Sequence, residues 1–406
     1  MACIYLVGTV DTKASELDYL RKLLQAENAD VRLVDVSTRP HGGRCDVSAE
    51  TVASHHPDGA SAVLGKSDRG DAVGAMMTAF EHFCEARKDD IQAMLGIGGG
   101  GGTSIITAGM RRLPYGVPKL MVTTLAAGDT SPYLGISDLI LMPSVTDLAG
   151  LNRISRVILS NAAHAIAGMA SAPKVEDDRT KPPVGLTMFG VTTPAVTAIT
   201  KQLSSAYDCL VFHATGTGGR MMEQLLLEGQ LDGVIDMTTT EIADLLCGGV
   251  LSAGETRLDG IARTRKPCVM APGALDMVNF QGFDSVPEKY RGRLLYRHNA
   301  NVTLMRTTPE ENRAIGEWIA AKLNACEGPV RLLLPEKGVS ALDIEGGDFF
   351  DVEADTALFE ALRDGIETNA DRQVISLPLH INDPEFAAAA CEHFLEITNR
   401  HTNSQG

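Results

Sequence analysis

A run of five glycines at 98–102 is the feature of this sequence that most directly suggests chemistry. It lies between an apolar run, 91–97, and a helix-like run that begins with Thr103 and Ser104. Fixing a glycine costs more conformational entropy than fixing any other residue, and what it offers is a bare backbone that a ligand can approach closely. Because a helix N-terminus adds unpaired N–H groups and a partial positive charge, we expect phosphate or nucleotide binding by Gly98, Gly99, Gly100, Gly101, Gly102 and Thr103. The alternative is a tight strand-to-helix turn that needs only some of these glycines.

The known phosphate-binding fingerprints do not fit this run. No Lys-Ser or Lys-Thr pair follows the glycines, so the run is not a Walker P-loop. The spacing G-x-G-x-x-G occurs at 96–101, but it follows a late strand instead of the first strand of the domain, where the dinucleotide fingerprint belongs. The motif therefore favours a phosphate group without identifying the ligand.

A second group of polar residues follows the first predicted strand. Thr9, Asp11, Thr12 and Lys13 could supply hydroxyls, a carboxylate for Mg²⁺ and an ammonium that neutralises phosphate. The alternative is that Asp11 and Thr12 only cap the next helix. Asp35 ends the second predicted strand, where a ribose-binding acid often lies.

The second half of the chain carries residues suited to acid–base chemistry. His213 ends a strand just before a glycine-rich turn, Asp236 ends the next strand, and Glu241 follows three threonines, so these side chains could converge as catalytic groups. Arg220 could clamp a carboxylate or phosphate. The alternatives are that His213 bonds a neighbouring loop and that Glu241 is only an early helix residue. No pair of His or carboxylate residues has a clear metal-ligand spacing, so we expect no metal centre made by the protein alone. Further polar residues at loop positions are expected to line a cleft: Asp276, Asn279, Arg297, His298 and Asn299.

The elements that must position these residues follow a repeated strand–helix pattern. Short apolar runs that end in Gly, Thr or Asp, as at 3–9, 91–98 and 184–190, are typical of buried parallel strands, and helical runs such as 14–28 and 71–87 lie between them. The pattern predicts an α/β protein made of two doubly wound, Rossmann-like domains, whose mainly parallel sheets face each other across a cleft. A polar, proline-containing stretch at 171–183 predicts a linker, which gives a nucleotide-binding domain, 1–178, and a second substrate or partner domain, 179–406.

The loops of the two halves also match by pattern. VGTVDTK pairs with FGVTTPA, GIGGGGGTSI with ATGTGGRMM, and MVTTLAAGDT with IDMTTTEIAD. Ligands collect at the carboxyl ends of parallel strands, where all of these loops lie.

Composition excludes several classes of function. The chain has 406 residues, of which 44% are hydrophobic, and a net charge of −16, which disfavours binding to nucleic acid or to anionic membranes. The start of the sequence shows no basic leader and no apolar run is long enough for a membrane span, so we expect a cytoplasmic protein. The eight cysteines are scattered, as is typical of reduced core thiols.

Taken together, VGTVDTK, GIGGGGGTSI, HATGTGGRMMEQL and the long run at 122–163 resemble the family named for the amino-terminal ATP-binding region of the tomato mosaic virus resistance protein. The resemblance implies two Rossmann-like domains, ATP as cofactor with Mg²⁺, and self-association as a homodimer. It also implies a nucleotide site that includes Thr123 and Thr124 besides the glycine run and the turn at 9–13. In plant members a barrel region follows on the same chain, so a separate barrel-domain protein is an expected partner.

Three functions are consistent with the sequence. The first is an ATP-binding enzyme that acts on a small anionic or sugar-derived metabolite in the cleft. The second is a nucleotide-dependent regulatory or binding module without turnover. The third is an ATP-independent lyase or hydrolase of sugar acids, whose substrate occupies the glycine run.

Overall fold

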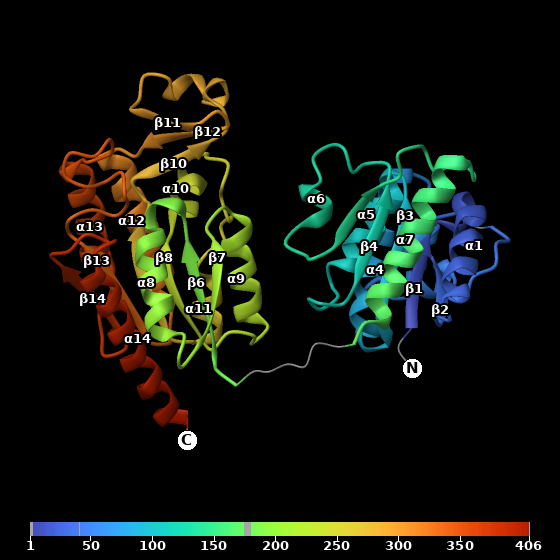
Figure 1. Cartoon of the computed structure of the whole chain (residues 1–406), viewed down its shortest axis with the longest axis horizontal. Helices are drawn as coiled ribbons and strands as arrows, with labels where there is room; N and C mark the ends of the chain where they lie inside the picture. Colours follow the sequence, from blue (N-terminus) through green and yellow to red (C-terminus); the bar gives the residue numbers. More distant parts are fainter. Residues whose placement is uncertain (1–2, 40, 174–179, 406) are drawn as a thin grey trace. The chain divides into compact units, whose positions relative to one another are not determined.

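The computed structural model describes residues 3–39, 41–173 and 180–405. The chain divides into two compact units, residues 1–176 and 177–406, each with its own sheet (Figure 1). Each unit is described by itself. Among the described residues, none of the helices has both the length and the apolar composition that crossing a membrane requires.

The first unit is built on a five-stranded parallel sheet in the order β2-β1-β3-β4-β5. Its strands are β1 (Cys3–Gly8), β2 (Val31–Asp35), β3 (Ile91–Gly98), β4 (Lys119–Thr123) and β5 (Ile140–Pro143). This is the strand order of flavodoxin-like doubly wound folds.

Helices cover both faces of this sheet because successive residues of a buried strand point to opposite sides. Cys3, Tyr5 and Val7 of β1 join the core with α4 and α5, whereas Ile4 and Leu6 join the core with α1 and α7. The helices of the unit are α1 (Val10–Ala26), α2 (Ala49–Ala53), α3 (Ser61–Leu64), α4 (Arg69–Arg87), the 3-10 turn η1 (Lys88–Asp90), α5 (Gly100–Met110), α6 (Ser131–Leu134) and α7 (Arg153–Ser171).

The second unit has a six-stranded parallel sheet in the order β14-β13-β9-β8-β6-β7. Its strands are β6 (Pro183–Met188), β7 (Asp208–His213), β8 (Gly233–Thr238), β9 (Cys268–Gly273), β13 (Val330–Pro335) and β14 (Arg372–Leu377). A small antiparallel sheet, not anticipated from the sequence, is formed by β10 (Met277–Phe280), β12 (Val302–Arg306) and β11 (Leu295–Asn299). Figure 1 shows this small sheet at the top of the unit.

Helices again cover both faces of the large sheet. Leu333 of β13 packs with α8 and α14, and its neighbours Leu332 and Leu334 pack with the helices of the opposite face. The helices are α8 (Thr193–Leu203), α9 (Thr217–Leu227), α10 (Thr240–Cys247), α11 (Asp259–Thr264), α12 (Pro309–Asn324), α13 (Val352–Gly365) and α14 (Pro384–Gln405), with the 3-10 turns η2 (Gly190–Thr192), η3 (Phe283–Ser285) and η4 (Glu288–Tyr290).

The prediction of two doubly wound α/β domains with parallel sheets is therefore confirmed. The predicted linker, 171–183, lies between the end of α7 and the start of β6, and its residues 174–179 lie outside the described residues. All eight cysteines are free thiols, and six of them are buried.

The pattern match between the loops of the two halves is wrong for two of its three pairs. When the strands of each large sheet are numbered in chain order, the first five have the spatial order 2-1-3-4-5 in both sheets. By position, β6 is therefore equivalent to β1, β7 to β2 and β8 to β3. The glycine run after β3 is therefore equivalent to the threonines after β8, and the glycine turn after β7 is equivalent to the loop after β2. Glycine content follows local packing and does not identify equivalent turns, whereas strand order does.

The glycine run itself also differs from its predicted form. Gly98 ends β3 and Gly99 is the N-cap of α5, so Gly100, Gly101 and Gly102 form the first turn of the helix instead of a loop before it. Packing explains this: the helix buries Ile105, Ile106 and Met110 against the sheet, which outweighs the poor helix propensity of glycine.

Gly98 is the glycine of this run that the fold requires. A Cβ there would lie 2.9 Å from Gly102 C and from Thr103 N, which are backbone atoms that cannot rotate away. We expect Gly98→Ala to lower the free energy of unfolding by about 1–3 kcal/mol, measured by urea denaturation. Gly168→Ala in α7, where a Cβ meets open space, is the matched control and should not destabilise the protein. Equal stability of Gly98→Ala and the wild type would contradict this account.

Candidate functional site

The turn after β1 and the glycine run after β3 meet at one hollow of about 250 Å³ in the first unit. The chain passes from β1 to β2 on one side and returns to β3 on the other side of β1, so this is the point where the strand order reverses. In doubly wound sheets, ligands bind at the carboxyl ends of the strands at this point. The hollow is lined by Thr9, Asp11, Thr12, Lys13, Thr38, Arg39, Arg69, Val73, Gly99, Gly100, Gly101, Gly102 and Ile105.

Packing does not require the glycines that line the hollow most closely. A Cβ on Gly99, Gly100 or Gly102 would find its nearest neighbour at 3.8 to 3.9 Å, an ordinary contact distance. Alanine would fit at these positions, and at Gly100 and Gly102, which lie inside the helix, it would favour the helix by up to about 1 kcal/mol each. What glycine adds here is a first helical turn whose N–H groups are not shielded by side chains.

The N-termini of α5 and α1 differ in whether their N–H groups are already occupied. In α5 the first intrahelical bond is from Thr103 N to Gly99 O at 2.8 Å, so the N–H groups of the three preceding glycines lie before the hydrogen-bonded part of the helix. In α1, by contrast, Val10 N donates to Asp35 Oδ1 at 3.0 Å. An incoming anion therefore finds free donors on α5 rather than on α1.

Asp35 is placed as a support for this turn and does not line the hollow. It is buried, and its Oδ1 also accepts from Ser37 Oγ at 2.5 Å, while its Oδ2 lies 2.7 Å from His41 Nε2. Its carboxylate is thus committed to the chain itself, which leaves the predicted ribose contact without support in this geometry.

The charges around the hollow are mainly positive. Lys13, Arg39 and Arg69 line it together with a single carboxylate, that of Asp11. Lys13 interrupts α1 with non-helical dihedrals (φ −125°, ψ 18°), which separates the short first turn that carries Asp11 from the rest of the helix. A local excess of cations in a chain of net charge −16 favours a small anionic ligand at this place.

The predicted threonines divide into buried and accessible ones. Thr103 Oγ1 and Thr123 Oγ1 lie 2.7 Å apart, and both residues are buried, so they join α5 to β4. Thr124 is exposed and lines a second hollow of about 440 Å³ with Ser144 and Thr146. A Cβ on Gly99 would lie 3.8 Å from Thr124 Oγ1, so this second hollow begins close to the first.

The glycine turn of the second unit already holds an anion that belongs to the chain. Glu241 Oε1 accepts from Gly216 N at 2.7 Å and from Gly219 N at 3.0 Å. The carboxylate thus takes the place at the start of α9 that a bound phosphate would take. A Cβ on Gly219 would collide with Glu241 Oε2, so this glycine serves an internal contact.

Glu241 belongs to a buried ionic network centred on Arg257. Arg257 donates from Nε to Glu241 Oε2 at 2.9 Å and from Nη1 and Nη2 to the two oxygens of Asp236, each at 2.7 Å. Burial lowers the pKa of the Arg257 guanidinium, but Asp236 and Glu241 hold that pKa well above its ordinary value. All four oxygens of Asp236 and Glu241 accept hydrogen bonds from the chain, so their arrangement is that of a structural network.

The other predicted catalytic residues lie outside this network. His213 is exposed at the end of β7, an edge strand, and packs edge to face on Phe189 at 5.4 Å. Arg220 is exposed, and its Nε donates to Gly216 O at 3.2 Å. The structure therefore joins Asp236 with Glu241 and does not bring His213 or Arg220 to them as a catalytic group.

The residues expected to line a cleft in the second unit are also dispersed. Asp276 and Asn279 are buried, and Asn279 donates from its backbone N–H to Asp244 Oδ1 at 2.8 Å. Arg297, His298 and Asn299 are exposed on β11.

Sequence reasoning missed Thr38, Arg39 and Arg69 at the first hollow. Thr38 and Arg39 follow β2, so the rule that ligands collect at carboxyl ends of strands could have found them. Arg69 begins α4, which is not joined directly to a strand end, and no signal in the sequence placed it there.

Comparisons with known proteins cover nearly the whole chain. Residues 2–175 match the model of the N-terminal domain, and residues 181–398 that of the C-terminal domain, of an uncharacterised protein family, UPF0261. A UPF0261 protein of Mesorhizobium japonicum is 62% identical over 401 residues, which are 99% of this chain and 100% of that protein. The ToMV resistance protein Tm-1 of Solanum lycopersicum is 42% identical over 428 residues, which cover 99% of this chain and 57% of that protein.

The network around Arg257 predicts how a change at Glu241 should act. Glu241→Gln removes one charge and places an amide beside Arg257, so we expect a loss of about 3 kcal/mol in the free energy of unfolding, measured by urea denaturation. Glu317→Gln, an exposed change on α12, is the control and should leave stability unchanged. A Glu241→Gln protein as stable as the wild type would show that the carboxylate is not structural.

Proposed function

The chain belongs to the uncharacterised protein family UPF0261, and from this premise we propose that its N-terminal domain binds ATP with Mg²⁺ in the hollow between the turns after β1 and β3. The observation that carries the proposal is the first turn of α5. Three successive glycines there present N–H groups at a strand-order switch point, although packing would accept alanine at Gly100 and Gly102. Such a turn is suited to the oxygens of a phosphate group.

The surrounding charges support a polyphosphate over a single neutral ligand. Lys13, Arg39 and Arg69 come from three separate elements and can neutralise several phosphate oxygens. The carboxylate of Asp11 is the acidic group on the lining and is suited to hold Mg²⁺, which usually binds through one or two carboxylates together with phosphates. The hollow that begins at Thr124 offers further room for the nucleoside.

The proposal is limited to nucleotide binding. The enzymatic alternative relies on His213, Asp236, Glu241 and Arg220. The oxygens of Asp236 and Glu241 are taken by Arg257 and by backbone N–H groups, and His213 and Arg220 do not join them. A regulatory module needs no catalytic group, so this geometry favours a nucleotide-dependent regulatory module over an enzyme.

The direct test is calorimetric titration of the purified protein with Mg-ATP, with ADP and NAD as comparison ligands, and an assay for released phosphate in the same samples. Binding of Mg-ATP without phosphate release would support a nucleotide-dependent module. Continuous release of phosphate would show that the protein also hydrolyses ATP. If no nucleotide binds, ATP is the wrong ligand, and phosphate and small carboxylates should be titrated instead.

Gly100→Ala separates binding from stability. The new Cβ points toward the helix N-terminus and would stand among the free N–H groups, so we expect the Kd for Mg-ATP to rise at least about tenfold, or about 1.4 kcal/mol. Because a Cβ at Gly100 has room, the free energy of unfolding should stay the same or rise by up to about 1 kcal/mol. Gly168→Ala is the control for the same chemical change in α7, away from the hollow, and should leave the Kd unchanged. A wild-type Kd for Gly100→Ala would contradict the assignment of the glycine run.

Arg69→Gln tests the contribution of charge. A hydrogen bond to a charged group is worth about 1.5–3 kcal/mol, so we expect the Kd for Mg-ATP to rise by roughly tenfold or more. Raising the salt concentration should weaken wild-type binding more than binding by the variant, because the variant has one cation fewer to be screened. Arg313→Gln on α12 removes a charge in the other domain and should change neither quantity.

A further inference from the structure

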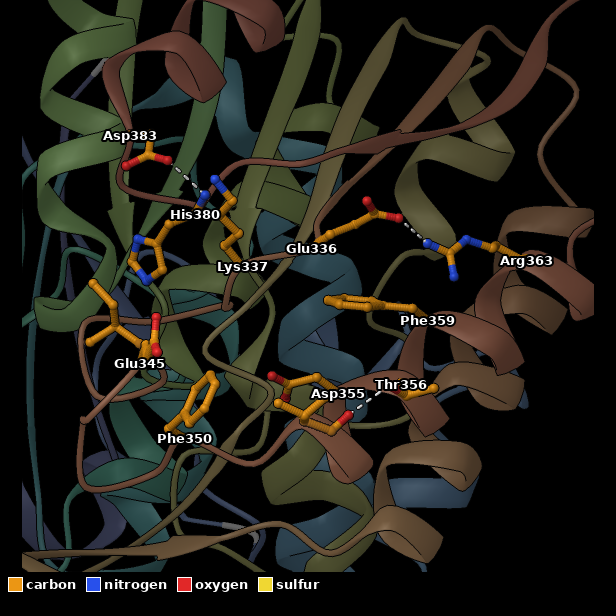
Figure 2. A pocket seen from close by; sticks show the side chains of 12 residues that line it. Glu336, Lys337, Glu345, Phe350, Asp355, Thr356, Phe359, Arg363, His380 and Asp383 are labelled. Atoms are coloured by element: carbon orange, nitrogen blue, oxygen red, sulfur yellow. Dashed lines mark hydrogen bonds and ion pairs between the residues drawn. The ribbon is translucent and has the colours of Figure 1, made fainter.

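The second unit contains a pocket of about 590 Å³ that none of the preceding assignments uses. It lies where β13 and β14 end, between α13 and the loop that joins β13 to α13, and Figure 2 shows the side chains around it. Its size falls within the range of ligand sites for small molecules. The pocket is lined by Glu336, Lys337, Ile344, Glu345, Phe350, Val352, Asp355, Thr356, Phe359, Arg363, His380 and Asp383.

One part of the lining is apolar and open to solvent. Ile344 is 45%, Phe350 41% and Val352 60% exposed, although each is a large apolar residue. Single exposed apolar residues are common, but here they gather at one concave site together with Phe359. An apolar or aromatic portion of a ligand would cover them.

The polar part of the lining has an excess of negative charge. Arg363 pairs with Glu336, so these two charges balance within the lining. Asp355 pairs with Arg306, which lies behind the lining. What remains is one ammonium, that of Lys337, against two carboxylates, those of Glu345 and Asp383. This balance favours a ligand that carries a positive charge.

Behind the pocket, three carboxyl groups lie around one guanidinium, that of Arg306. Arg306 Nη2 donates to Asp355 Oδ1 at 2.7 Å, but the same guanidinium also lies 3.8 Å from Asp343 Oδ1. Asp276 lies in the same cluster, and in the described part of the chain neither Asp276 Oδ1 nor Asp343 Oδ1 has a hydrogen-bond partner. Burial, and then Asp343, raise the pKa of Asp355 to about 8, so near pH 7 this carboxyl group mostly holds a proton until a cation approaches it.

We propose that this pocket binds a small organic cation, an amine that carries an apolar or aromatic body. Its ammonium pairs with the exposed Glu345 and with Asp355, whose ionised form it favours. Its apolar body covers Phe350 and Phe359, whose rings can also attract the positive charge. This site is separate from the nucleotide hollow and does not depend on it.

The test uses the full-length protein and three probes of similar shape: phenethylamine, phenethyl alcohol and hydrocinnamate, which are cationic, neutral and anionic. Binding is measured by ligand-detected NMR and calorimetry. We expect phenethylamine to bind with a Kd of about 1 mM or tighter, and the alcohol and the carboxylate to bind at least about tenfold more weakly. Equal or tighter binding of hydrocinnamate overturns the proposal, as does the absence of phenethylamine binding at about 10 mM.

Variants then locate the site. Glu345→Gln and Phe350→Ala change exposed side chains, so both proteins should fold, and each should raise the Kd of phenethylamine by about threefold to fivefold. Asp355→Asn should also raise the Kd, but it removes a carboxylate that accepts from Arg306 Nη2, so its stability must be measured as well. Glu360→Gln, an exposed change on α13 that does not line the pocket, should leave the Kd unchanged. An unaltered Kd in both Glu345→Gln and Phe350→Ala would place any binding elsewhere and overturn the assignment.

Discussion

The close approach of α5 to the end of β3 is the contact on which the N-terminal site depends. A side chain at position 98 would force the backbone to shift, because the first helical turn passes 2.9 Å from where a Cβ would be. This contact brings the start of α5 to the edge of the sheet, next to the turn after β1. That turn is fixed in its place by Asp35, which accepts a hydrogen bond from Val10 N. One close contact and one buried carboxylate thus bring the two loops together.

The two domains show two ways to satisfy a glycine turn at the start of a helix. Unpaired N–H groups at a helix N-terminus attract an anion in either case. In the C-terminal domain the anion is internal, because Glu241 bonds to Gly216 and Gly219 and is itself held by Arg257. In the N-terminal domain the glycines of α5 face a hollow lined by cations. The same strand order therefore supports a closed structural network in one domain and a candidate binding site in the other.

The sequence predicted the parallel α/β fold because alternation of strand and helix depends on local patterns, which a single sequence contains. It also predicted which turns meet in the N-terminal domain, since residues that follow neighbouring parallel strands share one edge of the sheet. It could not predict that Asp35 and Glu241 face inward, because burial of a carboxylate depends on distant donors such as Arg257. Arg69 was not found because it lines the hollow from α4, a helix that does not follow a strand directly, so no strand end indicated it.

The glycines in the first turn of α5 lower the stability of the protein, and folding alone does not explain why they are there. Glycine in a helix is less favourable than alanine by up to about 1 kcal/mol at each position, and natural domains are stable by only about 5–15 kcal/mol. Gly98 lies outside the helix, at the end of β3, and is required there by its contact with the helix backbone. At positions 100 and 102 glycine is not required, since a Cβ would meet only ordinary contacts. Gly100 and Gly102 thus lower stability without a packing reason, and they lie at a switch point of the sheet beside three cations. A site that must stay open for phosphate oxygens would show this combination.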